Sequence, residues 1–146
     1  MQLVIEKDAD SLGRAAADLI ARRMNEAIAQ KGEARMILST GASQFETLAA
    51  LIREPMDWGK VTIFHLDEYV GLPETHPASF RRYLRERVLS KVLVGQAYLV
   101  DGEGDVEKNL RELTAKLCEK PVDVGGIGIG ENAHIAFNDP PADFET

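Results

Sequence analysis

Apolar residues along this chain recur at helical spacing in four separate stretches. The longest runs from residue 8 to residue 30, where apolar positions fall every three or four residues and Gly32 supplies a stop. The other three cover residues 45–52, 80–88 and 106–117. The pattern predicts four amphipathic helices.

Short runs of apolar and β-branched residues lie next to these stretches, as expected of buried strands. They cover residues 35–38, 61–66, 97–100 and 122–127. Strands that alternate with helices favour an α/β fold, in which helices cover both faces of a mainly parallel sheet. With 146 residues, of which 45% are hydrophobic, the chain is long enough for one such domain with an apolar core.

The net charge limits the classes of binding partner that we expect, and the single cysteine indicates the cellular compartment. The net charge is −7, from 17 basic and 24 acidic residues without a long run of either sign, so neither nucleic acid nor an anionic membrane is an expected partner. No apolar run approaches the roughly 18 residues of a membrane span, and the first residues lack the pattern of a secretory signal. Cys118 has no second cysteine to pair with, which fits a reducing, cytoplasmic location.

Ligands of parallel α/β folds bind beyond the carboxyl ends of the strands, and three polar segments occupy such places in this sequence. The first holds small and hydroxyl residues, which let backbone N–H groups approach an anion and add donors of their own. These residues are Ser39, Thr40, Gly41, Ala42 and Ser43. The alternative interpretation is a capping box formed by Ser43 and Glu46, which requires no ligand.

The second segment carries two adjacent carboxylates at the end of a predicted strand. Alternation places at least one of them toward the ligand crevice, where burial and neighbouring charges could adjust its pKa for general-base work. Asp67 is the candidate base, and Glu68 is its neighbour. The alternative is that this pair only begins a turn or caps a helix. We interpret His65, within the strand, as a core or surface residue rather than a catalyst.

The third segment, residues 128–140, combines a glycine-rich turn with a histidine and a carboxylate five residues later. His134 could move protons near neutral pH, and Asp139 could orient its imidazole. A glycine-rich loop with an incidental histidine explains the same residues without any chemistry. The glycines lack the full dinucleotide pattern, and the three histidines lack metal-ligand spacing, so neither a dinucleotide cofactor nor a metal is expected.

Together, and in this order, the three segments resemble the glucosamine-6-phosphate deaminase/isomerase family, whose relatives include 6-phosphogluconolactonases. The resemblance rests on Ser-Thr-Gly-Ala-Ser at 39–43, Leu-Asp-Glu-Tyr-Val-Gly-Leu at 66–72 with His76, and Gly-Ile-Gly-Glu-Asn-Ala-His-Ile-Ala-Phe-Asn-Asp-Pro at 128–140. It implies a Rossmann-like α/β domain of the deaminase/isomerase type. Because members of the family continue well beyond the third segment, we expect residues 1–146 to be the first part of a longer domain.

The resemblance also implies a reaction and a role for each segment. Asp67 would remove the proton from C2 of an open-chain amino sugar, and His134 would assist ring opening. The loop from Thr40 to Ser43 would hold the sugar phosphate. Residues Ser39, Glu68 and Gly130 would also lie at the substrate site. The implied reaction converts glucosamine 6-phosphate to fructose 6-phosphate and ammonia, with no organic cofactor or metal.

Three residues of the third segment depart from the family's pattern. Asn132 stands where many deaminases have Asp, which removes a charge that would support an imidazolium. Asp139 stands where the family commonly has the Glu that pairs with the histidine, so its reach is shorter by one methylene. Ala133 replaces a glycine, which restricts the turn if that position needs a positive φ. We still assign Asn132 and Asp139 to the catalytic group around His134.

Two other functions stay open at this stage. The Ile-Ala-Phe-Asn run after His134 looks like the deaminase branch, so a 6-phosphogluconolactonase-like hydrolase is the second hypothesis. A non-catalytic sugar-phosphate-binding module is the third, because few basic residues lie near the three segments. A shortened parallel sheet would also expose an edge and apolar helix faces, which favours homo-oligomerisation.

Overall fold

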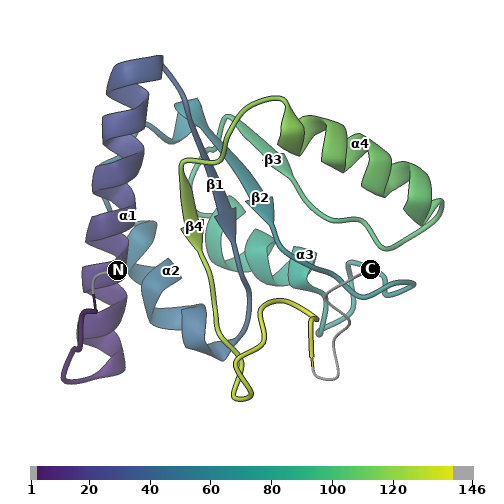
Figure 1. Ribbon diagram of the computed structural model, residues 1–146, viewed down its shortest axis with the longest axis horizontal. Coiled ribbons are helices and arrows are strands. Elements are labelled where there is room, and N and C mark those ends of the chain that lie inside the picture. The colour runs from purple at the N-terminus through teal and green to yellow at the C-terminus, as the bar shows by residue number, and fades with distance from the viewer. Residues whose placement is uncertain (1–2, 140–146) are drawn as a thin grey trace.

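The computed structural model describes residues 3–139, and its architecture confirms the predicted α/β class (Figure 1). The helical elements are α1 (Ala9–Lys31), η1 (Ala42–Gln44), α2 (Phe45–Leu51), η2 (Trp58–Lys60), α3 (Phe80–Leu84), η3 (Arg85–Leu89) and α4 (Val106–Cys118). The strands are β1 (Ala34–Leu38), β2 (Val61–His65), β3 (Gln96–Tyr98) and β4 (Val124–Gly126). All of these strands run parallel in the order β3-β2-β1-β4.

Because β1 lies between β2 and β4, the three polar segments meet at the carboxyl ends of these strands. β1 pairs with β2 from Ala34↔Val61 to Leu38↔His65. On its other side, β1 pairs with β4, where Leu38 lies opposite Gly126. Because parallel strands end at the same side of a sheet, the residues that follow β1, β2 and β4 emerge next to one another.

Local signals fix the limits of α1. The Asp8 side chain accepts a hydrogen bond from the Ser11 N–H at 2.7 Å, which satisfies one of the free donors of the first turn. At the other end, Gly32 adopts φ 80° and donates its N–H to the Ile28 carbonyl at 2.8 Å. The predicted bounds of this helix, 8 and 30, are therefore correct to within one residue.

Alternation along β1 divides its side chains between two layers. Met36 is fully buried in the core with Met24 of α1 and Leu48 of α2. Arg35 faces the opposite layer, where its guanidinium donates to the carbonyls of Lys116 and Leu117 at the end of α4, at 2.6 and 3.2 Å. Figure 1 shows α1 and α2 on one side of the sheet and α4 on the other. The prediction of helices on both faces is confirmed.

The remaining helix predictions hold with two changes. The predicted helix over 80–88 is a short α-helix, α3, followed by the π-helical turn η3, and the predicted helix over 45–52 is preceded by the 3₁₀ turn η1. Within residues 3–139, no helix has the length and apolar character that crossing a membrane requires.

Candidate functional site

A cavity of about 230 Å³ lies where the segments that follow β1, β2 and β4 meet. From the β1 side it is lined by Ser39, Thr40 and Ser43. From the β2 side it is lined by Asp67 and by Phe80, the first residue of α3. The segment after β4 supplies the rest of the wall: Gly128, Ile129, Gly130, His134, Ala136, Phe137 and Asp139. The structure thus brings together seven of the eleven residues that the sequence assigns to a site.

Ser39 joins the β1 and β4 sides of this cavity. Its backbone N–H donates to the Gly126 carbonyl at 2.8 Å, and its hydroxyl oxygen accepts the Gly128 N–H at 2.7 Å. A Cβ on Gly128 would lie 3.2 Å from the Ser39 hydroxyl and from the Gln44 amide, so glycine permits this close approach. Within residues 3–139 the Ser39 hydroxyl donates no hydrogen bond, so its proton is available to a ligand.

The loop after β1 carries backbone donors without acceptors. Gly41 adopts φ 107° and serves as the N-cap of η1, with its carbonyl accepting the Gln44 N–H at 3.1 Å. Among the described residues, the N–H groups of Thr40, Gly41, Ala42 and Ser43 make no hydrogen bond. Free N–H groups at the start of a helical turn are suited to an anion.

The capping-box alternative for Ser43 is wrong. The cap position belongs to Gly41 for η1 and to Gln44 for α2, and neither makes a side-chain cap hydrogen bond. The Ser43 hydroxyl accepts only the Gln44 side-chain amide, at 3.1 Å, among the hydrogen bonds of residues 3–139. It lines the cavity instead.

Asp67 lies half-buried in the cavity wall. Burial raises the pKa of its carboxyl above the usual value, and the charge of Glu68 raises it further, while His134 acts in the opposite direction. A carboxylate with a raised pKa binds a proton more readily, which suits a general base.

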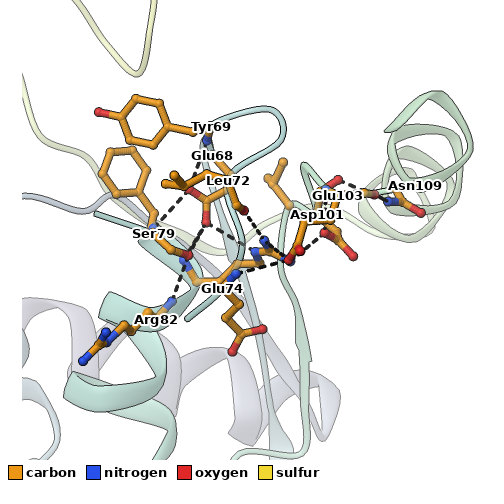
Figure 2. A network of polar contacts seen from close by, with 12 residues as sticks. Glu68, Tyr69, Leu72, Glu74, Ser79, Arg82, Asp101, Glu103 and Asn109 are labelled. Carbon is orange, nitrogen blue, oxygen red and sulfur yellow. Dashed lines mark hydrogen bonds and ion pairs between the residues drawn. The ribbon is translucent and has the colours of Figure 1, made fainter. Parts of the chain in front are cut away.

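Glu68, which the sequence places at the substrate site, does not line the cavity, because its carboxylate points into a structural network outside the cavity wall (Figure 2). Its oxygens accept the Ser79 hydroxyl at 2.8 Å and the Nε–H of Arg81 at 3.3 Å. They also accept the backbone N–H groups of Tyr69, Phe80 and Arg81, at 3.0, 3.1 and 2.9 Å. Burial alone would raise the pKa of Glu68, but these donors outweigh it and lower the pKa.

Arg81 completes the same network. Beyond Glu68, its guanidinium donates to Asp101 at 2.6 Å and to Glu103 at 2.8 Å. Its side chain is 6% exposed and that of Glu68 is fully buried, so two opposite charges are held away from water by dense hydrogen bonding. The network therefore fixes the segment that carries Asp67 to the start of α3.

His134 sits in a polar group with two neighbours from its own loop. Its Nδ1 lies 3.0 Å from the Asp139 carboxylate, and it also contacts the Asn132 amide oxygen. The Asn132 amide nitrogen in turn donates to the same Asp139 oxygen at 3.3 Å. Asn132 does not line the cavity but contacts His134 and Asp139, which do, and Asp139 reaches the imidazole.

The backbone of this loop has a positive φ at Ala133, the conformation that an alanine in place of glycine makes less favourable. Ala133 has φ 66° and Ala136 has φ 55°, a region that disfavours residues with a Cβ. The turn is closed by hydrogen bonds from the Ala133 N–H to the Gly130 carbonyl and from the Gly130 N–H to the His134 carbonyl, both at 2.9 Å. A Cβ on Gly130 would lie 2.1 Å from the His134 ring, so glycine lets the imidazole occupy this position.

Three aromatic side chains that the sequence analysis did not assign to the site pack together at the cavity. The ring centroid of Phe137 lies 4.9 Å from that of Tyr69 and 5.6 Å from that of Phe80. The cluster holds the histidine loop against the segment after β2. Tyr69 and Phe137 belong to the motifs of the second and third segments, but the sequence carries no signal that these two rings would meet Phe80.

The other two histidines lie apart from the cavity. His65 is a core residue, as interpreted from its place in the strand, and its Nδ1 accepts the Val100 N–H at 3.2 Å. Burial lowers its pKa to about 4. His76 caps a turn, where its Nδ1 accepts the Ala78 N–H at 3.1 Å. Within the described part of the chain, no three His, Cys, Asp or Glu side chains gather as metal ligands.

Comparisons with known proteins identify the family and the fold. The family described as glucosamine-6-phosphate isomerases/6-phosphogluconolactonase matches residues 7–140. A glucosamine-6-phosphate deaminase of Lactobacillus delbrueckii subsp. bulgaricus is 33% identical over the whole chain, which spans 61% of that relative's length. A monomeric glucosamine-6-phosphate deaminase of known structure superposes on the whole chain with a TM-score of 0.86 at 27% identity, over 62% of its own length. A 6-phosphogluconolactonase of Shewanella baltica shares the fold over 92% of this chain and 59% of its own, with a TM-score of 0.79 at 22% identity.

Proposed function

Because this chain belongs to the family of glucosamine-6-phosphate isomerases and 6-phosphogluconolactonases, we propose that its cavity binds an amino-sugar phosphate and converts it to a ketose phosphate with loss of ammonia. The substrate is glucosamine 6-phosphate, and the products are fructose 6-phosphate and ammonia. The observation that carries this proposal is the meeting of Asp67, with its raised pKa, and the His134–Asp139 pair in one cavity.

The loop after β1 binds the phosphate. Its free N–H groups, from Thr40 to Ser43, and the hydroxyls of Thr40 and Ser43 supply donors to phosphate oxygens. No Lys or Arg lines this cavity, so within residues 3–139 the site relies on neutral donors.

His134 opens the sugar ring. With Nδ1 held by Asp139, a neutral imidazole presents Nε2 as the proton acceptor. It takes the proton of the C1 hydroxyl and returns a proton to the ring oxygen as the C1–O5 bond breaks. The product is the open-chain aldehyde.

Asp67 then carries out the isomerisation. Its carboxylate removes the proton from C2, which gives an enolamine with a double bond between C1 and C2. Proton return at C1 leaves an imine at C2. Water adds to that carbon, ammonia departs, and the ketone of the product remains. Each proton transfer contributes roughly 10²–10⁴-fold to the rate.

Ammonia release from glucosamine 6-phosphate tests the proposal. We would assay this chain and the complete open reading frame that encodes it, because the chain spans about three fifths of its relatives' length. Asp67→Asn should reduce release by at least about 10²-fold. The matched control is Asp18→Asn, which removes a carboxylate 70% exposed on α1 and should leave the rate unchanged.

A parallel assay with 6-phosphogluconolactone separates the two activities of the family. Lactone hydrolysis without ammonia release, in both forms of the protein, would contradict the deaminase assignment in favour of a hydrolase. Sugar-phosphate binding without either reaction would indicate a binding module.

A further inference from the structure

The anion-binding loop is held by one side chain from another element. The Tyr83 hydroxyl of α3 donates to the Gly41 carbonyl at 2.9 Å. Within residues 3–139, the only other side chain that hydrogen-bonds to residues 40–43 is that of the adjacent Gln44, which donates to the Ser43 hydroxyl. Gly41 adopts φ 107° and has no side chain of its own to fix this conformation.

Holding the Gly41 carbonyl also sets the direction of a donor. In a trans peptide, the carbonyl of one residue and the N–H of the next point in opposite directions across a rigid plane. The bond from Tyr83 therefore fixes the orientation of the Ala42 N–H. This is one of the groups without an acceptor in the described structure.

The Tyr83 ring is itself immobilised. It stacks on Phe45 with centroids 5.8 Å apart, and the guanidinium of Arg87 lies 3.7 Å from the Phe45 centroid and 5.1 Å from that of Tyr83. Burial raises the pKa of Tyr83 to about 12, so its hydroxyl stays protonated and remains a donor at physiological pH.

α3 connects this ring to the segment that carries the candidate base. Ser79 is the N-cap of α3, and its hydroxyl donates to Glu68 at 2.8 Å, directly next to Asp67 in the chain. A single short helix therefore contacts the anion loop through Tyr83 and the base segment through Ser79.

We propose that Tyr83 is a positioning residue that holds the anion-binding loop at a fixed place relative to Asp67. The inference rests on the proposed function, since it assigns Tyr83 a part in the same site. Removing the hydroxyl leaves the Gly41 carbonyl bonded only to the neighbouring Gln44 N–H, so the loop loses its tie to α3, samples other orientations and binds phosphate more weakly. The transfer of protons at C1 and C2 takes place elsewhere in the cavity and is affected much less.

Tyr83→Phe tests the inference, because it keeps the ring and removes only the hydroxyl. Binding of inorganic phosphate is measured by calorimetry, and the KM and kcat for glucosamine 6-phosphate by ammonia release. One lost hydrogen bond should weaken phosphate binding and raise KM by roughly 3- to 10-fold, with kcat within about twofold. The matched control is Tyr98→Phe on β3, whose hydroxyl donates to Gln96 at 2.7 Å and whose loss should change none of these values.

The possible outcomes are separable. Unchanged phosphate affinity and KM in Tyr83→Phe, even with a lower melting temperature, would overturn the inference by reducing Tyr83 to a packing residue. Failure of the unsubstituted protein to bind phosphate would overturn it too, because there would be no anion site to hold. Phosphate binding that weakens in Tyr83→Phe, in a protein that releases no ammonia, would support Tyr83 and contradict only the proposed reaction.

Discussion

An oxygen of the Asp139 carboxylate lies 3.0 Å from Nδ1 of His134, five residues earlier in the same loop. Positive φ at Ala136, between the two residues, and at Ala133, directly before His134, turns the chain so that the two side chains meet. Asn132 bridges them through its amide. The Asp139 carboxylate is therefore in place to contact the imidazole directly.

Asp139→Asn should lower kcat for ammonia release by roughly 10- to 100-fold, because it removes the negative charge next to the imidazole. Asp139→Glu restores the charge and should keep activity within about tenfold of the unsubstituted protein. Steady-state kinetics measure both variants. Equal activity in Asp139→Asn and the unsubstituted protein would remove Asp139 from the mechanism.

Gly130→Ala should displace His134, because the new Cβ would lie 2.1 Å from Cε1 of the imidazole. We expect kcat/KM to fall by at least about 10²-fold through misplacement of this one side chain, with a small change in melting temperature. The control is Gly59→Ala, where the new Cβ would meet the Asp57 carboxylate at an ordinary 3.4 Å. A Gly130→Ala variant with normal kinetics would show that the ring does not work from this position.

Glu68→Gln should lower the free energy of unfolding by roughly 2–4 kcal/mol, because the amide cannot accept all the donors that now reach the carboxylate and leaves Arg81 less well paired. Urea unfolding measures the change. The same substitution at Glu74, which pairs with Arg85 at the surface, should cost at most about 1 kcal/mol. Similar small losses in both variants would mean that the buried network adds little to stability.

His65 should make the protein less stable in mild acid. Its pKa is about 4 in the folded chain and 6.5 ordinarily, so between these values the unfolded chain binds more protons than the folded one. Above pH 6.5, His65 is neutral in both the folded and the unfolded chain and costs no stability. As the pH falls from 6.5 toward 4, the free energy of unfolding decreases by about 3 kcal/mol in total. Urea unfolding between pH 7 and pH 4 should therefore show a shallower decline for His65→Gln. The exposed His76→Gln serves as the control, and parallel curves for His65→Gln and the unsubstituted protein would rule out this role for His65.

Sequence patterns located the helices and the fold class because their signals are local. The Asp8 cap and the Gly32 stop bound α1 without help from the rest of the molecule. Strand limits were less exact: the run at 122–127 forms a strand only over Val124–Gly126, because its length depends on how many of its residues reach β1. The order of the strands had no local signal, since it depends on how the whole chain packs.

In the candidate site, too, local signals were predictable and long-range contacts were not. The rule that ligands bind at strand ends, together with the three motifs, brought Asp67 and His134 into one predicted site, and the match over residues 7–140 confirms the family. The direction of the Glu68 side chain could not be predicted, because it is set by donors at Ser79 and Arg81, 11 and 13 residues away. The aromatic cluster was missed because Tyr69, Phe80 and Phe137 meet only in the folded chain.

β4 joins the sheet through three residue pairs with β1, and two of its three residues are glycines. A strand this short, at the edge of the sheet that residues 3–139 form, can detach at a lower free energy than global unfolding. Its detachment would break the two bonds at Ser39 and carry His134 away from Asp67, while β1, β2 and their helices stay folded. In a hydrogen-exchange experiment, the amides of Ser39 and Gly128 would then lose protection together and well before those of β2. A ligand that bridges both walls of the cavity would slow exchange at these two amides, and a tighter ligand would slow it more.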